Sequence, residues 1–354
     1  MIRALVLLLV LLVAGPVRAE RIRVAAYDVG LSRSGPGLLL FDLRARKPPA
    51  DIAAVLAVIR ETRPDILLLT GFDQDFRGVA LTALRARLAA GAGGIDYPFA
   101  YAPPGNAGVE SGFDLDGDGR LRGAGDALGW GRFPGQGGMA LLSRLPVDAE
   151  ASHDFSGLPW ADLPGARLPI RPHGAPVLDP EARSGWPLAS NALWDVAVTL
   201  PGGRRLRLLA SNPTPPLFDG PEQFNLLRNA DEIRFWRLYL DGAAFPDSVG
   251  RMARLDGPFV LLGDLNTDPV AGAGDRAAIA ALLAHPALRD PNPPRATARA
   301  GERALRLDYA LPARELDAPD AAVFWPEPGE PLAELVAAGP AHRLVWVDLR
   351  FPDP

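Results

Sequence analysis

Apolar and polar residues follow two spacings along the chain, and these spacings predict its strands and helices. Residues 21–29 alternate between polar and apolar types before a glycine, which is typical of a strand with one buried face. Residues 66–70 are almost continuously apolar, as expected for a strand covered on both faces. By the same criteria, further strands are predicted at residues 138–147, 193–200, 204–212, 258–263, 305–312 and 342–349.

Helical spacing of apolar residues appears in four other segments. The first begins at Asp51, which is the predicted N-cap, and ends before Pro64. The others are residues 79–90, 222–240 and 277–285. In the third helix, charged residues stand three and four apart, and we expect them to form ion pairs on a solvated face: Arg228, Asp231, Glu232 and Arg234.

The order of these elements predicts the architecture. Strands outnumber helices, and most strands are too apolar to leave a face exposed to water. We therefore expect an α+β fold, a four-layer α/β/β/α sandwich in which two mixed sheets pack face to face with helices outside each. No composition break divides residues 20–354, so one domain is predicted, with a long Gly- and Pro-rich loop at residues 102–136.

The first 19 residues have the pattern of a secretory signal peptide. Arg3 precedes an apolar run from Ala4 to Ala14, and the small residues Val17 and Ala19 suggest cleavage before Glu20. The apolar run is shorter than the roughly 20 residues that span a bilayer, which favours cleavage over a retained anchor. We expect a periplasmic or secreted protein without a membrane span after cleavage.

Charge and cysteine content exclude several classes of function. The formal net charge is −5, and loss of residues 1–19 would make it −7. Tight binding to duplex DNA needs a basic surface that neutralises phosphates, so duplex DNA is not a favoured partner. The chain has no cysteine, which excludes disulfides, a thiolate nucleophile and thiolate metal ligands.

Polar residues at the ends of three predicted strands suggest a site. Asp264 and Asn266 follow the apolar run at residues 258–263, and residues two apart on a strand share a face. Asp308 and His342 belong to the last two predicted strands. Taken alone, each of these residues has a simpler interpretation as a turn, cap or surface residue, because Asp and Asn favour turns.

The order of the motifs resembles a known superfamily. GDLN at residues 263–266, RLDYALP at residues 306–312 and HRLVWVDL from residue 342 resemble, in that order, the C-terminal motifs of the endonuclease/exonuclease/phosphatase superfamily. PDILLLTGFDQD, LLSRLPV and NPTPPLFDGPEQFN resemble blocks of its secreted bacterial members. The resemblance spans nearly the whole mature chain, and it implies a DNase I-like fold and metal-dependent hydrolysis of a phosphoester, with a small phosphoester favoured over duplex DNA.

The resemblance also implies roles for the polar residues. Asp264 would activate or orient the attacking water, and Asn266 would donate a hydrogen bond to a phosphoryl oxygen. His342 would contact the phosphate as imidazolium, and Asp308 would hold its ring through the other nitrogen. Asn212 could donate a further hydrogen bond. Arg228 or Asn229 could also approach this site, because their helix follows a Pro-rich loop.

Four positions depart from the superfamily pattern. Asp28 stands where members carry Asn, Gly71 where they carry a metal-binding Glu, Asn212 where they carry His, and Ala341 where they carry Asp. The lost Glu weakens the case for Mg²⁺ or Mn²⁺, which prefer carboxylate oxygens. These departures leave two hypotheses: a divergent phosphoesterase, and a catalytically inactive member that acts as a binding module.

Other carboxylates could compensate for the lost Glu. Asp28 could restore one ligand, and Asp73 or Asp75 could reach inward from the loop that follows the second strand. The catalytic metal set predicted from sequence is therefore Asp28 and Asp73.

A second cation site is predicted in the long loop. Asp114, Asp116 and Asp118 alternate before Gly119, which is the spacing of an EF-hand-type calcium loop over residues 114–126. The twelfth position is Gly125 instead of Glu, and flanking helices are missing, so a true EF-hand is not expected. The prediction is a structural Ca²⁺ site that orders the loop, and the alternative is a solvated acidic turn.

Overall fold

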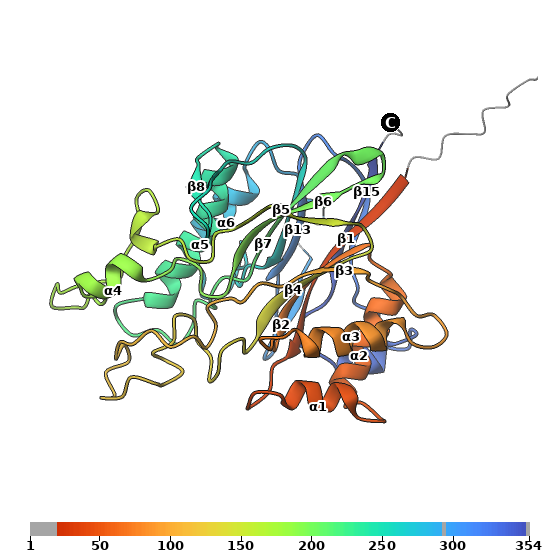
Figure 1. The fold of residues 1–354 in the computed structure, drawn as a ribbon, viewed down its shortest axis with the longest axis horizontal. Coiled ribbons are helices and arrows are strands. Elements are labelled where there is room, and N and C mark those ends of the chain that lie inside the picture. The colour runs from red at the N-terminus through yellow and green to blue at the C-terminus, as the bar shows by residue number, and fades with distance from the viewer. Residues whose placement is uncertain (1–19, 292–294, 352–354) are drawn as a thin grey trace, which may run out of the picture.

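The computed structural model describes residues 20–291 and 295–351, and its centre is a pair of sheets packed against each other (Figure 1). The predicted signal peptide at residues 1–19 lies outside the described residues. The six-stranded sheet has the order β14 (Asp317–Val323), β15 (Val345–Phe351), β1 (Glu20–Leu31), β2 (Ile66–Phe72), β4 (Gly138–Ser143) and β3 (Phe99–Tyr101). The five-stranded sheet has the order β13 (Asp308–Pro312), β10 (Phe259–Asp264), β7 (Arg205–Ser211), β6 (Leu193–Thr199) and β5 (Val147–Asp154).

Both sheets are mixed, because each contains one parallel pair at its centre. Strands β1 and β2 run parallel in the first sheet, and β7 and β10 run parallel in the second. Two short hairpins complete the strands: β11 (Ala298–Ala300) with β12 (Arg303–Leu305), and β8 (Phe245–Pro246) with β9 (Met252–Ala253). The carboxyl ends of four central strands therefore gather at the same edge of the sandwich.

Helices cover the outer face of each sheet (Figure 1). Beside the six-stranded sheet lie α1 (Leu38–Arg44), α2 (Ala50–Thr62), α3 (Val79–Ala89) and α7 (Ala333–Ala337). Beside the five-stranded sheet lie α5 (Phe224–Leu240) and α6 (Arg276–Leu283). The short helix α4 (Pro180–Gly185) and the 3-10 turns at Trp160–Asp162 and Pro201–Gly203 belong to connecting segments. The predicted α+β sandwich of two mixed sheets with helices outside is confirmed.

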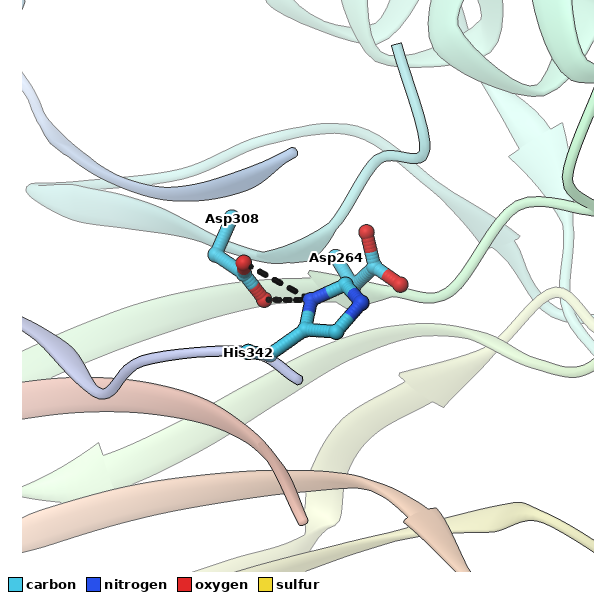
Figure 2. A group of neighbouring side chains, drawn as sticks. All are labelled: Asp264, Asp308 and His342. Atoms are coloured by element: carbon cyan, nitrogen blue, oxygen red, sulfur yellow. Dashed lines mark hydrogen bonds and ion pairs between the residues drawn. The ribbon is translucent and has the colours of Figure 1, made fainter. Parts of the chain in front are cut away.

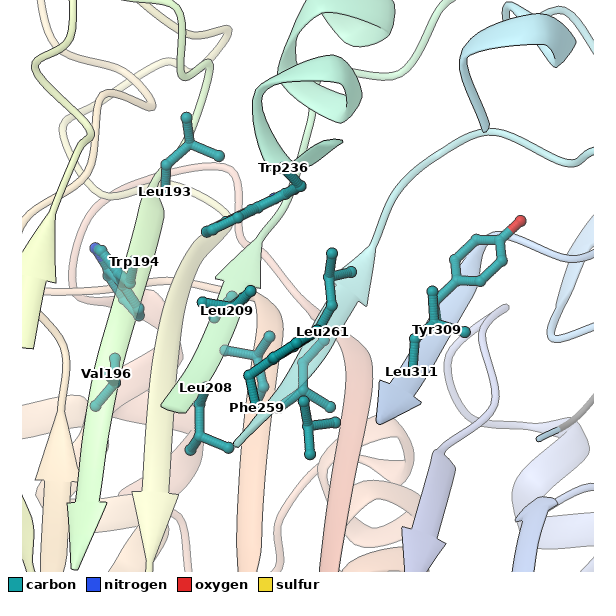
Figure 3. Close-up of a cluster of buried hydrophobic side chains, with 14 of the residues drawn as sticks. Leu193, Trp194, Val196, Leu208, Leu209, Trp236, Phe259, Leu261, Tyr309 and Leu311 are labelled. Carbon is teal, nitrogen blue, oxygen red and sulfur yellow. The ribbon is translucent and has the colours of Figure 1, made fainter. Parts of the chain in front are cut away.

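Alternation along the strands builds two apolar layers. On β1, Ile22, Val24 and Ala26 face the other sheet, whereas Ala25 and Tyr27 face the helices. Figure 3 shows the cluster that the five-stranded sheet shares with α5, in which the indole of Trp236 covers the sheet. Because side chains alternate, the residue after Tyr27 again faces the space between the sheets.

Two local predictions were wrong. Asp51 is not the N-cap of α2, because the helix already begins at Ala50 and Pro49 holds the N-cap position without a side-chain cap. The carboxylate of Asp51 pairs instead with Arg33, at 2.9 Å. Residues 138–147 do not form one strand, because β4 ends at Ser143 and β5 begins in the other sheet at Val147. The Ser143 hydroxyl hydrogen-bonds to the backbone of Leu145 in the turn between them.

The prediction for α5 was right about one ion pair, Arg234 Nε with Asp231 Oδ1 at 3.1 Å, but wrong about the solvated face. Arg228, Asp231 and Glu232 are at most 3% exposed, so they do not lie on a solvated face. Their charges are satisfied by loops that pack over the helix: Asp231, for example, accepts hydrogen bonds from the Trp160 indole and the Arg167 amide. Spacing along one helix cannot reveal partners that other segments supply.

Edge and short elements were missed from the sequence. Strand β14 is an edge strand in which most side chains remain accessible, so its apolar pattern is weak. Residues 102–137 form an extended loop held by isolated bridges such as Ala107 with Gly129. Among the described residues, no helix is long and apolar enough to cross a membrane.

Candidate functional site

Polar side chains follow the central strands where their carboxyl ends meet. Asp28 lies near the end of β1, Asp264 is the last residue of β10, and Asn212 directly follows β7. Strand β1 contacts β10 across the interface between the sheets. Residues from both sheets therefore reach one region at this edge.

Register pairs two of the carboxylates directly. Asp264 lies opposite Asp308 on the neighbouring strand β13, so the two side chains share a face. Both are buried, at 4% and 1% exposure. Gly263 permits this geometry, because a Cβ there would lie 1.9 Å from the carbonyl oxygen of Ser211. Only glycine lets β10 approach β7 so closely at this point.

His342 completes a compact cluster with these carboxylates. It lies in the segment before β15, where its backbone bridges to Ala298. Its Nδ1 lies 2.9 Å and 3.1 Å from the two carboxylate oxygens of Asp308. Figure 2 shows the imidazole with Asp308 on one side and Asp264 on the other. One ligand atom from each of the three residues lies within 4.8 Å of the others.

The three residues of the cluster shift one another's pKa values. Burial by itself lowers the pKa of His342, but the carboxylates of Asp308 and Asp264 raise it, and the result is a pKa of about 11. Burial raises the pKa of Asp264 well above its usual range, and the positive charge of His342 opposes that rise. Burial likewise raises the pKa of Asp308 against the same opposing charge. The imidazole is therefore protonated at neutral pH.

Asp28 occupies the space that a side chain at position 71 would need. Its carboxylate accepts hydrogen bonds from the Thr70 hydroxyl and the Gly30 amide, both at 3.0 Å. A Cβ built on Gly71 would lie 2.7 Å and 2.9 Å from its two oxygens. Asp28 also raises the pKa of Asp264 electrostatically, which places it beside the cluster. Asp28 and any side chain larger than glycine at position 71 would therefore compete for the same space.

Asn212 and Asn266 lie close together at the same edge of the sandwich. The carboxamide nitrogen of Asn266 donates to the carbonyl oxygen of Pro213 at 3.0 Å, and it lies 3.5 Å from the side-chain oxygen of Asn212. Asn266 has a left-handed backbone, with φ of 53°, and its backbone N–H donates to the Asp264 carboxylate. The turn after β10 therefore aims Asn266 toward the loop after β7.

Asp73 and Asp75 do not join this group. The carboxylate of Asp73 accepts N–H bonds from Arg33 at 2.7 Å and Gly137 at 2.9 Å, so it organises loops beside the site. Asp75 accepts from Val79 and Ala80 at the start of α3. Both carboxylates thus organise the backbone around them, and a metal-binding role for Asp73 stays a prediction.

The acidic loop forms a second cluster. Asp114, Asp116 and Asp118 each place one oxygen within 4.8 Å of the others. Asp126 is buried and closes the loop by accepting from the amides of Leu115 and Gly123. Calcium binding at this loop stays a prediction.

Sequence reasoning did not single out Thr70, which anchors Asp28. The signal was present, because Thr70 is the one polar residue of the apolar run at residues 66–70. Ala341 lies directly before His342, and its carbonyl oxygen accepts the backbone amide of Arg299.

Comparison with known proteins places this geometry in a wider context. A family model described as "Endonuclease/Exonuclease/phosphatase family" matches residues 33–330. No curated protein matches the chain significantly. An endonuclease/exonuclease/phosphatase from Beutenbergia cavernae has a similar structure, with a TM-score of 0.55 and 19% identity over 94% of this chain and 72% of that one. A protein of the same description from Bacteroides vulgatus has a TM-score of 0.51 and 13% identity over 93% of this chain and 98% of that one.

Proposed function

Because the chain belongs to the endonuclease/exonuclease/phosphatase family and has its DNase I-like fold, we propose that it hydrolyses a phosphoester bond with the help of a divalent cation. The observation that carries the proposal is the cluster of Asp264, Asp308 and His342 with Asp28 beside it. Three buried or half-buried carboxylates at one edge cost free energy unless a positive charge compensates them. That cost favours a functional origin for the cluster.

The residues divide the chemistry between them. The raised pKa of Asp264 makes its carboxylate a stronger base, suited to orienting a water and accepting its proton. His342 remains an imidazolium and binds a phosphoryl oxygen as a fixed positive charge, while Asp308 holds the ring through Nδ1. Asn266 donates to Pro213 at 3.0 Å and makes a longer contact of 3.5 Å with the Asn212 side-chain oxygen, and a phosphoryl oxygen would take the hydrogen of this longer contact.

The donor set fits an oxygen-preferring cation such as Mg²⁺ or Mn²⁺. Asp28 would hold the ion beside the water that Asp264 orients, and the ion would polarise the phosphoryl oxygens. Asp28 takes the place of the carboxylate that Gly71 lacks, and its bonds to Thr70 and Gly30 orient it. Asn212 can donate a hydrogen bond but cannot transfer a proton, so its role is limited to binding the phosphate.

Substrate and location follow from charge and from the N-terminal pattern. The net charge of −5 disfavours long polyanions, so we propose a small phosphoester substrate instead of duplex DNA. We also propose export to the periplasm or beyond, directed by residues 1–19. Mass spectrometry of the exported protein tests this, with a mature N-terminus at Glu20 as the expected result and an intact Met1 as the contrary one.

Hydrolysis assays test the activity. The purified protein would be incubated with bis-p-nitrophenyl phosphate and p-nitrophenyl phosphate, with EDTA or with added Mg²⁺, Mn²⁺ or Ca²⁺. We expect cation-dependent hydrolysis that Asp264→Asn and His342→Gln each reduce by at least 100-fold. His285→Gln is the matched control, because His285 pairs with Asp241 outside the site. Binding of the cation without hydrolysis would instead support an inactive binding module.

A further inference from the structure

Helix α5 carries a buried polar face that contacts the loops around the site. Arg228 donates to the carbonyl oxygens of Pro187, Leu188 and Ala189, all within 2.9 Å. Glu232 accepts from the amide of Ser190 at 2.7 Å and from the amide of Thr214 at 2.9 Å. These bonds connect the helix to two loops, at residues 187–190 and at residue 214.

Asn229, between these two residues, makes the contacts nearest to the proposed site. It is fully buried, and its amide nitrogen donates to the carbonyl oxygens of Thr214 at 2.8 Å and Leu265 at 3.0 Å. Its amide oxygen accepts from the Thr267 hydroxyl at 2.6 Å. One side chain thus joins the loop after β7 to the turn after β10.

Each partner of Asn229 is a close neighbour of a residue assigned to the chemistry. Thr214 lies two residues after Asn212. Leu265 lies between Asp264 and Asn266, and Thr267 follows Asn266. The contact between Asn266 and the Asn212–Pro213 segment therefore has a common support behind it.

We propose that Asn229 is a positioning residue that sets the spacing between Asn212 and the Asp264–Asn266 pair. This inference rests on the proposed function. Asn229 does not touch substrate; it acts by holding two loops whose side chains converge on one phosphorus. The turn after β10 needs this support, because Asn266 holds a left-handed backbone that non-glycine residues rarely adopt. A displacement near 1 Å of positioned groups costs about 100-fold in rate.

The main variant is Asn229→Leu, which keeps the branched shape and the number of heavy atoms and removes all three hydrogen bonds. We expect kcat to fall by at least tenfold while KM changes by less than about threefold, since alignment is lost and ground-state binding is largely kept. Asn225→Leu is the matched control on the same helix. Asn225 bonds to Leu217 and Thr214 in the same loop but not to Leu265 or Thr267, so kcat should change by less than about twofold.

A milder variant keeps the test decisive if Asn229→Leu does not fold. Thr267→Val removes one of the three bonds with almost no change in shape, and we expect a three- to tenfold loss in kcat. Folded Asn229→Leu or Thr267→Val with wild-type kcat would overturn the inference.

A second readout does not depend on activity. The side-chain amide signals of Asn212 and Asn266 in nitrogen-15 NMR spectra should shift in Asn229→Leu and stay unchanged in Asn225→Leu. Unchanged signals in both variants would overturn the inference. A wild-type protein that hydrolyses nothing would refute the proposed function, and the NMR shifts would then still decide the positioning role.

Discussion

The close approach of the Asp28 carboxylate to position 71 makes a quantitative prediction about Gly71→Ala. Gly71 has φ of 65°, and a left-handed alanine costs about 1 kcal/mol. The new Cβ would also lie 2.7 Å from the nearer oxygen of Asp28, so that carboxylate must move. Movement breaks its bonds to Thr70 and Gly30, worth about 1 kcal/mol each. The expected loss in free energy of unfolding is therefore about 3 kcal/mol.

A double-mutant cycle isolates the steric part of this cost. In an Asp28→Ala background the carboxylate is absent, so Gly71→Ala should cost only about 1 kcal/mol of backbone strain. The coupling between the two positions is then about 2 kcal/mol. Urea unfolding followed by tryptophan fluorescence measures each corner, since Trp194 and Trp236 are fully buried.

Gly78→Ala is the matched control for strain. Gly78 has φ of 64°, and nothing lies within 4 Å of a Cβ built there. Its substitution should cost about 1 kcal/mol in both backgrounds. Equal costs of Gly71→Ala with and without Asp28 would refute the argument that this carboxylate fills the space at position 71. Calorimetry with Mn²⁺ adds the functional readout, and Asp28→Ala should weaken binding at least tenfold.

Three further predictions concern protonation and calcium. Asp308→Asn should lower the pKa of His342 from about 11 toward its ordinary 6.5, and NMR titration of the metal-free protein measures this change. In the wild type, the ion pair stabilises the fold fully below about pH 6.5, and this contribution is lost as the pH rises toward 11. An unchanged titration would mean that Asp308 is not the main partner. Burial raises the pKa of Glu232 from 4.5 to about 7, so stability should fall as pH rises through that window, and Glu232→Gln should flatten the urea-midpoint profile there. Calorimetry should detect Ca²⁺ binding that Asp116→Ala abolishes; no binding by the wild type would leave only a solvated acidic turn.

Local pattern was sufficient where a residue's environment is set by its own neighbours in sequence. The run at residues 66–70 is apolar on both faces because the sheet is covered on both sides, and β2 contains it entirely. The spacing of Asp264 and Asn266 predicted a shared strand face at a strand end, but only Asp264 belongs to β10, and Asn266 follows in the turn with a left-handed backbone. Pattern was insufficient for β14, whose edge position leaves most side chains accessible and removes the alternation that identifies a strand.

Distance in sequence explains what remained hidden in the candidate site. Asp73 and Asp28 are both carboxylates near the end of a strand, and nothing local distinguishes them. Only the fold shows that backbone amides from Arg33 and Gly137 occupy Asp73, whereas Asp28 lies beside Asp264. The buried face of α5 was likewise invisible, because its partners come from loops up to 100 residues away.

The amino-acid sequence by itself determined the α+β sandwich, the order of its motifs and the residue types at the strand ends, since hydrophobic alternation and turn chemistry act between near neighbours. The tertiary structure alone decided which polar groups share a dielectric environment. Asp264, Asp308 and His342 perturb one another because closing two sheets brings strands from distant parts of the chain within a few ångströms and excludes water. Electrostatic coupling depends on that distance and that exclusion, and neither is written in the spacing of residues along the chain.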